Sequence, residues 1–338
     1  MTVDEAVAFL AACYGLRASA LTPIGAAGDA GRALYRITDE QGRSWVLRSY
    51  RVDGRVAPWL GGAAAPEWMD GRAALLAALE RRGYPAPRPL PARDGGLVAR
   101  DDTWCAFVEG FIAGAPLAWS SSDDIRALAE ALGRLHTLAP VPQAPPSWWH
   151  PVDHAAARAL AALGPAGPDI PDEWRALHAR FASALAFFRD HRDHADLPVT
   201  LIHGDCWPAN AVRTSAGHVA LIDWECAGLG AAVLDLGGLL ADCHPDPAPG
   251  ASIAVTPEPV AAVVVGYSQY RRLSPAELDV LPDVARFGVA FVGALRYLWA
   301  RQDGWNERIE RSLHRLRARF DAASSAAELA REQITRSS

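Results

Sequence analysis

Two aspartates and an asparagine in the second half of the chain have the types and spacing of a metal and phosphate site. Asp205 and Asp223 each follow an apolar pair that predicts the end of a strand, and Asn210 lies between them. Segments 211–214 and 218–221 flank a short turn and predict a hairpin that returns the chain toward its start. We therefore expect the three side chains to converge. Their carboxylate and amide oxygens suit Mg²⁺, whose coordination sphere is usually completed by water and nucleotide phosphates.

The elements that must position these residues fall into two regions. Segments 32–38 and 44–50 are bulky runs bounded by glycine turns, which is typical of a β-meander. After residue 113 the pattern becomes helical, and Ser274–Glu277 is a capping box that predicts the start of a long helix. This order predicts an α+β fold in two parts, a small antiparallel β lobe at 1–112 and a larger, mainly helical lobe at 113–338.

Composition excludes several kinds of chemistry. The chain has 338 residues and no lysine, so all 33 basic residues are arginine, which rules out a Walker-A lysine and a Schiff-base lysine. A net charge of −6 argues against a nucleic-acid-binding surface. Five scattered cysteines indicate a reducing compartment, and no apolar run reaches transmembrane length. We expect a cytoplasmic protein, monomer or homodimer, that binds neither nucleic acid nor a membrane.

The segment 203–225 resembles the catalytic and metal-binding core of the aminoglycoside phosphotransferase/choline kinase-like family, small-molecule relatives of the protein kinases. That family's HGDxxxxN motif matches 203–205 with Asn210, and its IDWE-type motif matches 222–225. The resemblance covers roughly residues 20–300. It implies a protein-kinase-like two-lobed fold and transfer of the γ-phosphate of ATP or GTP to a hydroxyl of a small molecule. Either motif alone also fits a plain turn and a strand-end cap; the two together favour the functional interpretation.

The resemblance also implies roles by position. Asp205 would accept the proton of the acceptor hydroxyl, while Asn210 and Asp223 would hold Mg²⁺ on the nucleotide phosphates. His203 would brace the catalytic loop, and Asp235 is interpreted as its structural anchor. For Glu225, two interpretations stay open: a group next to the metal ligands, or a carboxylate that faces an amine of the substrate.

The nucleotide site is expected in the first lobe. Gly25, Gly28 and Gly31 lie between the first two strands, where backbone N–H groups can approach phosphates, although a plain turn is an equal alternative. Arg48 lies on the third strand where kinases carry a phosphate-binding lysine, and its guanidinium can bind phosphate oxygens in pairs. The segment 107–111, including Glu109 and Phe111, would supply the hinge backbone that reads the base.

One departure from the family concerns the helix that usually supplies a glutamate partner for this lysine. Aligning that helix puts Arg72 at the expected position, and two arginines cannot form an ion pair. Asp70 lies nearby but out of register, and serves as the substitute partner in our hypothesis.

The identity of the acceptor is only loosely constrained. Residues 1–112 hold 13 arginines and 13 acids, whereas residues 113–338 hold 20 arginines and 26 acids, so the negative charge lies in the substrate-side lobe. This favours a cationic acceptor, with an aminoglycoside-type antibiotic as first choice. Choline-, homoserine- or macrolide-type acceptors remain open, as does a nucleotide-binding regulatory module without transfer activity.

Overall fold

The structure is a computed structural model. It describes residues 1–24, 32–56, 63–141, 144–145, 147, 164, 170–190, 197–248 and 250–337, with only the backbone for 187–190, 302–303 and 337. The expected glycine loop with Gly25, Gly28 and Gly31 lies outside these described residues.

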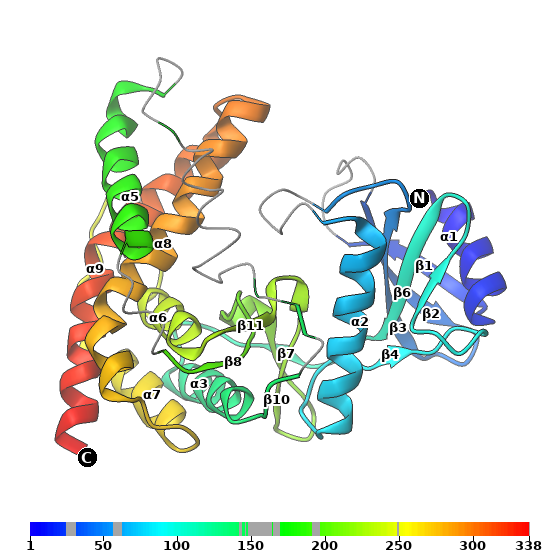
Figure 1. Ribbon diagram of the computed structural model, residues 1–338, viewed down its shortest axis with the longest axis horizontal. Coiled ribbons are helices and arrows are strands. Elements are labelled where there is room, and N and C mark those ends of the chain that lie inside the picture. Colours follow the sequence, from blue (N-terminus) through cyan, green and yellow to red (C-terminus); the bar gives the residue numbers. More distant parts are fainter. Residues whose placement is uncertain are drawn as a thin grey trace.

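The first region is a six-stranded antiparallel sheet between two helices (Figure 1). Strands follow the order β1-β2-β3-β6-β4, and β5 pairs with the central strand β6. The elements in chain order are α1 (Val3–Phe9), a π-helical turn (Leu10–Tyr14), β1 (Ala18–Pro23), β2 (Arg32–Asp39), β3 (Ser44–Arg51), α2 (Ala65–Arg81), β4 (Pro89–Leu90), β5 (Val98–Arg100) and β6 (Trp104–Gly110).

Side-chain alternation divides this sheet into two buried faces. Leu47 and Val108 point to the α1 side and belong to a small core of their own. Tyr50 and Phe107, from the same two strands, point to the α2 side and belong to the main core. The face that α2 covers is also the face to which Arg48 belongs, because residues two apart on a strand share a side.

The second region is mainly helical and holds short strands around the predicted loop (Figure 1). Its elements are β7 (Ala115–Pro116), α3 (Ser122–His136), α5 (Asp172–Asp190), β8 (Val199–Ile202), β9 (Ala211–Arg213), β10 (Val219–Leu221), β11 (Gly228–Ala231), α6 (Ala232–Asp242), α7 (Pro257–Ser268), α8 (Pro275–Asp303) and α9 (Glu307–Ser337). Strand β9 pairs with both β10 and β7, while β8 pairs with β11. The chain thus joins the second region soon after β6 ends.

The α+β, two-lobed prediction is confirmed, and so are several local ones. The capping box at Ser274 and Glu277 begins α8, and the predicted hairpin is β9–β10. Near the N-terminus, α1 continues directly into the π-helical turn. Helix α6 was not predicted, because almost all of its residues are buried and it lacks a polar face. No helix in the described part of the chain is long and apolar enough to cross a membrane.

Candidate active site

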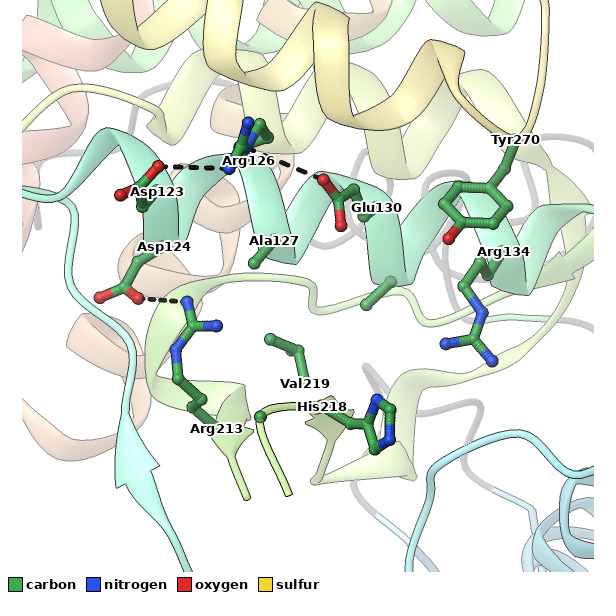
Figure 2. A pocket seen from close by; sticks show the side chains of 12 residues that line it. Asp123, Asp124, Arg126, Ala127, Glu130, Arg134, Arg213, His218, Val219 and Tyr270 are labelled. Atoms are coloured by element: carbon green, nitrogen blue, oxygen red, sulfur yellow. Dashed lines mark hydrogen bonds and ion pairs between the residues drawn. The ribbon is translucent and has the colours of Figure 1, made fainter. Parts of the chain in front are cut away.

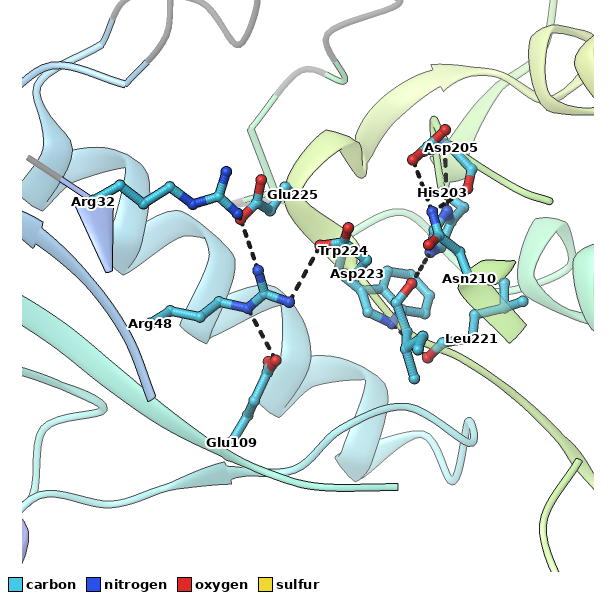
Figure 3. Close-up of polar contacts among 11 residues, drawn as sticks. Arg32, Arg48, Glu109, His203, Asp205, Asn210, Leu221, Asp223, Trp224 and Glu225 are labelled. Atoms are coloured by element: carbon cyan, nitrogen blue, oxygen red, sulfur yellow. Dashed lines mark hydrogen bonds and ion pairs between the residues drawn. The ribbon is translucent and has the colours of Figure 1, made fainter. Parts of the chain in front are cut away.

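The loop after β8 carries the predicted catalytic residues in a tightly braced conformation (Figure 3). The backbone N–H of Asp205 donates to Nδ1 of His203 at 3.3 Å, and Nε2 of His203 lies 3.0 Å from the carbonyl oxygen of Ile222. This arrangement requires a neutral imidazole with its proton on Nε2. Burial is the main cause that lowers the pKa of His203 and keeps it neutral. The ring therefore ties the loop to the strand that leads to Asp223.

Asp235, at the start of α6, binds the backbone of the same loop. Its carboxylate accepts hydrogen bonds from the backbone N–H groups of His203 at 2.6 Å and Gly204 at 2.8 Å. Nε2 of His136 lies 3.2 Å from the same carboxylate, and its Nδ1 lies 2.8 Å from the hydroxyl of Tyr267. Gly204 has φ +77°, and a Cβ there would lie 2.4 Å from a backbone oxygen, so only glycine fits.

Asp205 and Asn210 face one another across the loop. Nδ2 of Asn210 donates to Oδ2 of Asp205 at 2.7 Å and to its carbonyl oxygen at 3.0 Å, which leaves the amide oxygen as the atom that can face a cation. Burial, and then the negative charge of Asp223, raise the pKa of Asp205 to about 7. A carboxylate with this pKa can take up a proton near neutral pH.

Asp223 has the backbone and the environment of a functional residue. Its φ of +60° is the only positive value among the described non-glycine residues, a conformation that costs free energy and needs support from its surroundings. Its Oδ1 is buried without a hydrogen bond in the described part of the chain, although Nη2 of Arg48 lies 3.2 Å away. An oxygen left in this state suits a cation ligand.

The donor set fits Mg²⁺ held partly by phosphates. No group of three or more His, Cys, Asp and Glu side chains within the described ranges can hold a metal ion. Mg²⁺ does not need one, because it is usually bound by one or two carboxylates together with water and substrate phosphates. Asp223 and the amide oxygen of Asn210 provide such a partial set.

Arg48 is the centre of a buried ion-pair cluster between the two regions (Figure 3). Its Nε lies 3.0 Å from Glu109, its Nη1 lies 2.7 Å from Glu225, and its Nη2 faces Asp223. Arg32 pairs with Glu225 as well. Burial lowers the pKa of Arg48, but the three carboxylates outweigh this, so its pKa is raised. The guanidinium stays charged and uses all three of its nitrogens on carboxylates.

Three expectations about the nucleotide site can be compared with the structure. The Glu109 side chain is buried and bound to Arg48, while a hinge role for the backbone of 107–111 stays a prediction. The Phe111 N–H is engaged by the carbonyl oxygen of Ser44 at 3.0 Å, so it is not free to read a base. Asp70 is not the substitute partner of Arg48, because it pairs with Arg100 at 2.5 Å on the surface.

The acid partners of Arg48 were not predicted from the sequence. Glu109 is 61 residues away and Glu225 is 177 residues away, and no motif links them to the third strand. The Glu225 carboxylate bridges Arg48 and Arg32, and Arg48 also contacts Asp223, so Glu225 lies one contact away from a proposed metal ligand. Its two interpretations stay predictions. Only the pairing of β3 with β6, which puts Arg48 opposite Phe107, brings Glu109 close.

A separate hollow of about 560 Å³ lies between α3 and the β9–β10 hairpin (Figure 2). Asp124 and Arg213 form a 2.6 Å ion pair at one end, and Asp123 pairs with Arg126 on α3. None of the predicted site residues lines this hollow. The candidate active site is therefore the region between the Arg48 cluster and the loop of Asp205.

Comparisons with known proteins show similarity to a family of phosphotransferases and to homoserine kinases. Residues 23–279 match the model of the phosphotransferase enzyme family. A homoserine kinase of Hyphomonas neptunium is 26% identical over 90% of this chain and 87% of its own length. One of Methylobacterium radiotolerans is 30% identical over 68% of each chain.

Solved structures show the same fold at low sequence identity. An amicoumacin kinase in complex with AMP-PNP, Ca²⁺ and its antibiotic matches with a TM-score of 0.70 and 17% identity, over 96% of this chain and 94% of that one. A spectinomycin phosphotransferase in complex with ADP and spectinomycin matches with a TM-score of 0.63 and 13% identity, over 98% and 99%. With the family match across most of its length and this kinase-like two-lobed fold, the chain belongs to the phosphotransferase enzyme family.

Proposed function

We propose that this protein transfers the γ-phosphoryl group of ATP or GTP, with Mg²⁺, to a hydroxyl of a small molecule, and that a hydroxy amino acid of the homoserine type is the acceptor to test first. The convergence of Asp205, Asn210 and Asp223 between two lobes carries the phosphotransfer part of this proposal. The acceptor part is supported by the curated relatives and by local charge.

Asp205 would act on the acceptor. Its carboxylate, oriented by Asn210 Nδ2, accepts the proton of the acceptor hydroxyl while that oxygen forms a bond to the γ-phosphorus and the bond to the β,γ-bridging oxygen breaks. The products are the phosphorylated acceptor and a nucleoside diphosphate. Because the transition state is loose, most of the rate enhancement comes from positioning and from offsetting charge.

Asp223 and Asn210 would hold the metal ion. When bound, Mg²⁺ neutralises charge on the phosphates and orients the γ-phosphoryl group for in-line transfer. Asp223 is available for this, because its Oδ1 has no hydrogen bond among the described residues. Arg48 would hold the other phosphates, since an arginine can donate two parallel hydrogen bonds to phosphate oxygens.

A cation on the acceptor side favours a substrate with a carboxylate. Arg296 on α8 donates from Nε to Oγ of Ser312 at 2.9 Å and lies close enough to Asp205 for their charges to interact. Burial, followed by the charges of Arg315 and Arg308, lowers the pKa of Arg296 to about 10. An acceptor carboxylate next to these arginines would offset their repulsion. Homoserine carries such a group, and the two curated relatives described above are homoserine kinases.

A cationic antibiotic is the second candidate. The second lobe has six more acids than arginines, and two of the similar solved structures carry antibiotics in their names. Net charge summed over a lobe counts acids far from the site equally, whereas the charge of Arg296 is close enough to interact with that of Asp205. We therefore rank the carboxylate-bearing acceptor above the cationic one.

An acceptor panel tests both parts of the proposal. Purified protein is incubated with Mg²⁺ and ATP or GTP in the presence of L-homoserine, kanamycin, choline or erythromycin. The formation of ADP or GDP and the ³¹P spectra are recorded. We expect turnover with L-homoserine that is lost in Asp205→Ala and kept in Asp279→Ala, an exposed aspartate on α8.

Other results would redirect the assignment. Faster turnover with kanamycin than with homoserine would establish the second candidate and reject the first. Nucleotide binding without transfer to any acceptor would instead identify a regulatory module.

A further inference from the structure

Helix α2 carries a buried arginine that the proposed chemistry leaves without a role. Arg72 is only 4% exposed, and among the described residues its Nε and Nη1 have no hydrogen-bond partner. Burial is the main cause that lowers its pKa to about 10. An arginine kept in this state costs folding free energy, because two of its nitrogens have lost water without gaining a hydrogen bond. A buried group kept at such a cost is a candidate for a functional role.

The surroundings of Arg72 place it beside the Arg48 cluster. Its guanidinium lies over the ring of Trp68, 5.4 Å from the centroid and one helical turn away. The Trp68 ring in turn contacts Tyr50, with centroids 5.5 Å apart. Tyr50 and Arg48 lie two residues apart on β3 and so share the face that α2 covers.

Among the groups whose charge acts on Arg72, Glu225 is the carboxylate. The charges of these two side chains act on one another: Glu225 raises the pKa of Arg72, and Arg72 helps to lower that of Glu225 against the effect of burial. With Arg72 included, the cluster has three arginines (Arg32, Arg48, Arg72) and three carboxylates (Glu109, Asp223, Glu225) and is neutral. Without Arg72 it has one excess negative charge.

Nucleotide binding would change the ion pairs of this cluster at Arg48. Every guanidinium nitrogen of Arg48 faces a carboxylate, so a phosphate that binds the two outer nitrogens as a pair competes with Glu225 and Asp223 for them. Glu109 holds Nε from within the sheet. Glu225 holds Nη1, and its side chain is 12% exposed, so release from Arg48 would leave a mostly buried carboxylate short of one cation. Nε and Nη1 of Arg72, which have no hydrogen bond among the described residues, are the donors that we assign to that carboxylate.

We propose that Arg72 is a positioning residue of the nucleotide site, which takes Glu225 as an ion-pair partner when nucleotide phosphates draw Arg48 away from that carboxylate. Arg72 itself touches neither nucleotide nor acceptor. It favours the transfer of Arg48 to the phosphates, because Glu225 then keeps two cationic partners, Arg32 and Arg72, in place of Arg32 alone. This inference rests on the proposed function, because it assumes that Arg48 binds the phosphates of a nucleotide.

A double-mutant cycle on the full-length protein tests this inference. The variants are Arg72→Met, which keeps the length and apolar stem of the side chain, Glu225→Gln, and the two combined. Calorimetry measures the Kd of Mg²⁺–AMP-PNP, and steady-state kinetics give kcat and the nucleotide KM. Arg100→Met is the matched control, because Arg100 is an exposed arginine that pairs with Asp70 of the same helix.

We expect Arg72→Met to raise the nucleotide Kd and KM about tenfold, with less than a threefold change in kcat and with no fall in the melting temperature of the nucleotide-free protein. In the Glu225→Gln background, Arg72→Met should change the Kd less than twofold, because the carboxylate that it serves is gone. Arg72→Lys should recover part of the affinity, and Arg100→Met should match the wild type.

Three results overturn the inference. They are an Arg72→Met protein with the Kd of the wild type, a Kd effect of the same size in the Glu225→Gln background, and a lower melting temperature without a change in Kd. A wild-type protein that binds no Mg²⁺–nucleotide overturns the proposed function and this inference together. A wild type that binds and transfers phosphate while the cycle shows no coupling overturns the inference alone.

Discussion

The loop of Asp205 and the cluster around Arg48 are held in place by different forces. In the loop, the Asp235 carboxylate accepts two backbone N–H hydrogen bonds, and the neutral His203 links the loop to the carbonyl group of Ile222. Most of these contacts are therefore hydrogen bonds to the backbone, whose position is fixed by the fold. In the cluster, charged side chains from separate elements balance one another. Ligand charge can rearrange the second kind of contact far more easily than the first.

This difference fits the tasks proposed for the two regions. A group that takes a proton from an acceptor must stay within hydrogen-bond distance of it, and a rigid loop achieves this. A group that binds phosphates must exchange one set of negative partners for another, and a neutral cluster of ion pairs permits the exchange. We therefore expect substitutions in the loop to act on kcat and substitutions in the cluster to act on nucleotide affinity and stability.

The largest effect is expected at the centre of the loop. Asp205→Ala should lower kcat about 10³-fold, the typical contribution of a positioned general base, with less than a threefold change in the nucleotide KM. The measurement is steady-state kinetics with the best acceptor of the panel. An Asp205→Ala protein that keeps a tenth of the wild-type kcat would remove the distinction between the two regions.

The next largest effect is expected at the centre of the cluster. Arg48→Met leaves the buried Glu109 and the mostly buried Glu225 with fewer cations, which should lower the free energy of unfolding by about 3–4 kcal/mol at pH 8. Urea unfolding measures this, with Arg51→Met as the control, because Arg51 lies on the same strand with its side chain half exposed. Equal stability of the two variants would show that the ion pairs of Arg48 do not stabilise the fold.

The anchor of the loop should respond somewhat less. Asp235→Ala removes the acceptor of two buried backbone N–H groups, and each unpaired donor is costly, so we expect a loss of about 3 kcal/mol. Unlike Arg48→Met, this variant should lose kcat more than nucleotide affinity, because the loop of Asp205 loosens. Asp279→Ala is the control. A change confined to the nucleotide Kd would contradict the assignment.

The same difference explains what the sequence predicts and what it does not. The loop is nearly contiguous: 203–205, Asn210 and 222–225 lie in one stretch of chain, so a motif and a hairpin were enough to bring Asp205, Asn210 and Asp223 together. The division into a strand-rich first region and a mainly helical second region also follows from local patterns. Asp235 accepts two backbone hydrogen bonds from the loop, which agrees with its interpretation as an anchor.

The cluster depends on the tertiary fold. Glu109 reaches Arg48 because β6 lies between β3 and β4, an order that no local pattern specifies. The register of β3 against β6 decides which acidic residue meets Arg48, and a shift of one residue would turn Glu109 to the opposite face. For Arg72 the sequence showed only a departure from the family, and its burial became apparent once α2 was seen to pack on Tyr50.

The smallest expected effect is a pH dependence of stability, which arises from Asp205 in the loop and not from Arg48 in the cluster. Burial and the charge of Asp223 raise the pKa of Asp205 from 3.8 to about 7. Between these values the folded protein keeps a proton that the unfolded chain has lost, so this group's contribution to stability falls as the pH rises from 4 to 7. Allowing for partial exposure of Asp205, we expect Asp205→Asn to exceed the wild type by about 2 kcal/mol at pH 8 and to match it near pH 4.

Paired urea titrations of wild type and Asp205→Asn at several pH values measure this difference, in which all other titrating groups cancel. Arg48→Met compared with the wild type serves as the reference, because the guanidinium does not titrate in this range and the loss should remain large at pH 8. Adding Mg²⁺ and nucleotide should shrink the Asp205 difference, since a cation at Asp223 removes part of its cause. A stability difference that stays constant from pH 4 to pH 8 would mean that the Asp205 carboxylate is as well solvated as one on the surface. The loop and the cluster would then not differ in the way proposed above.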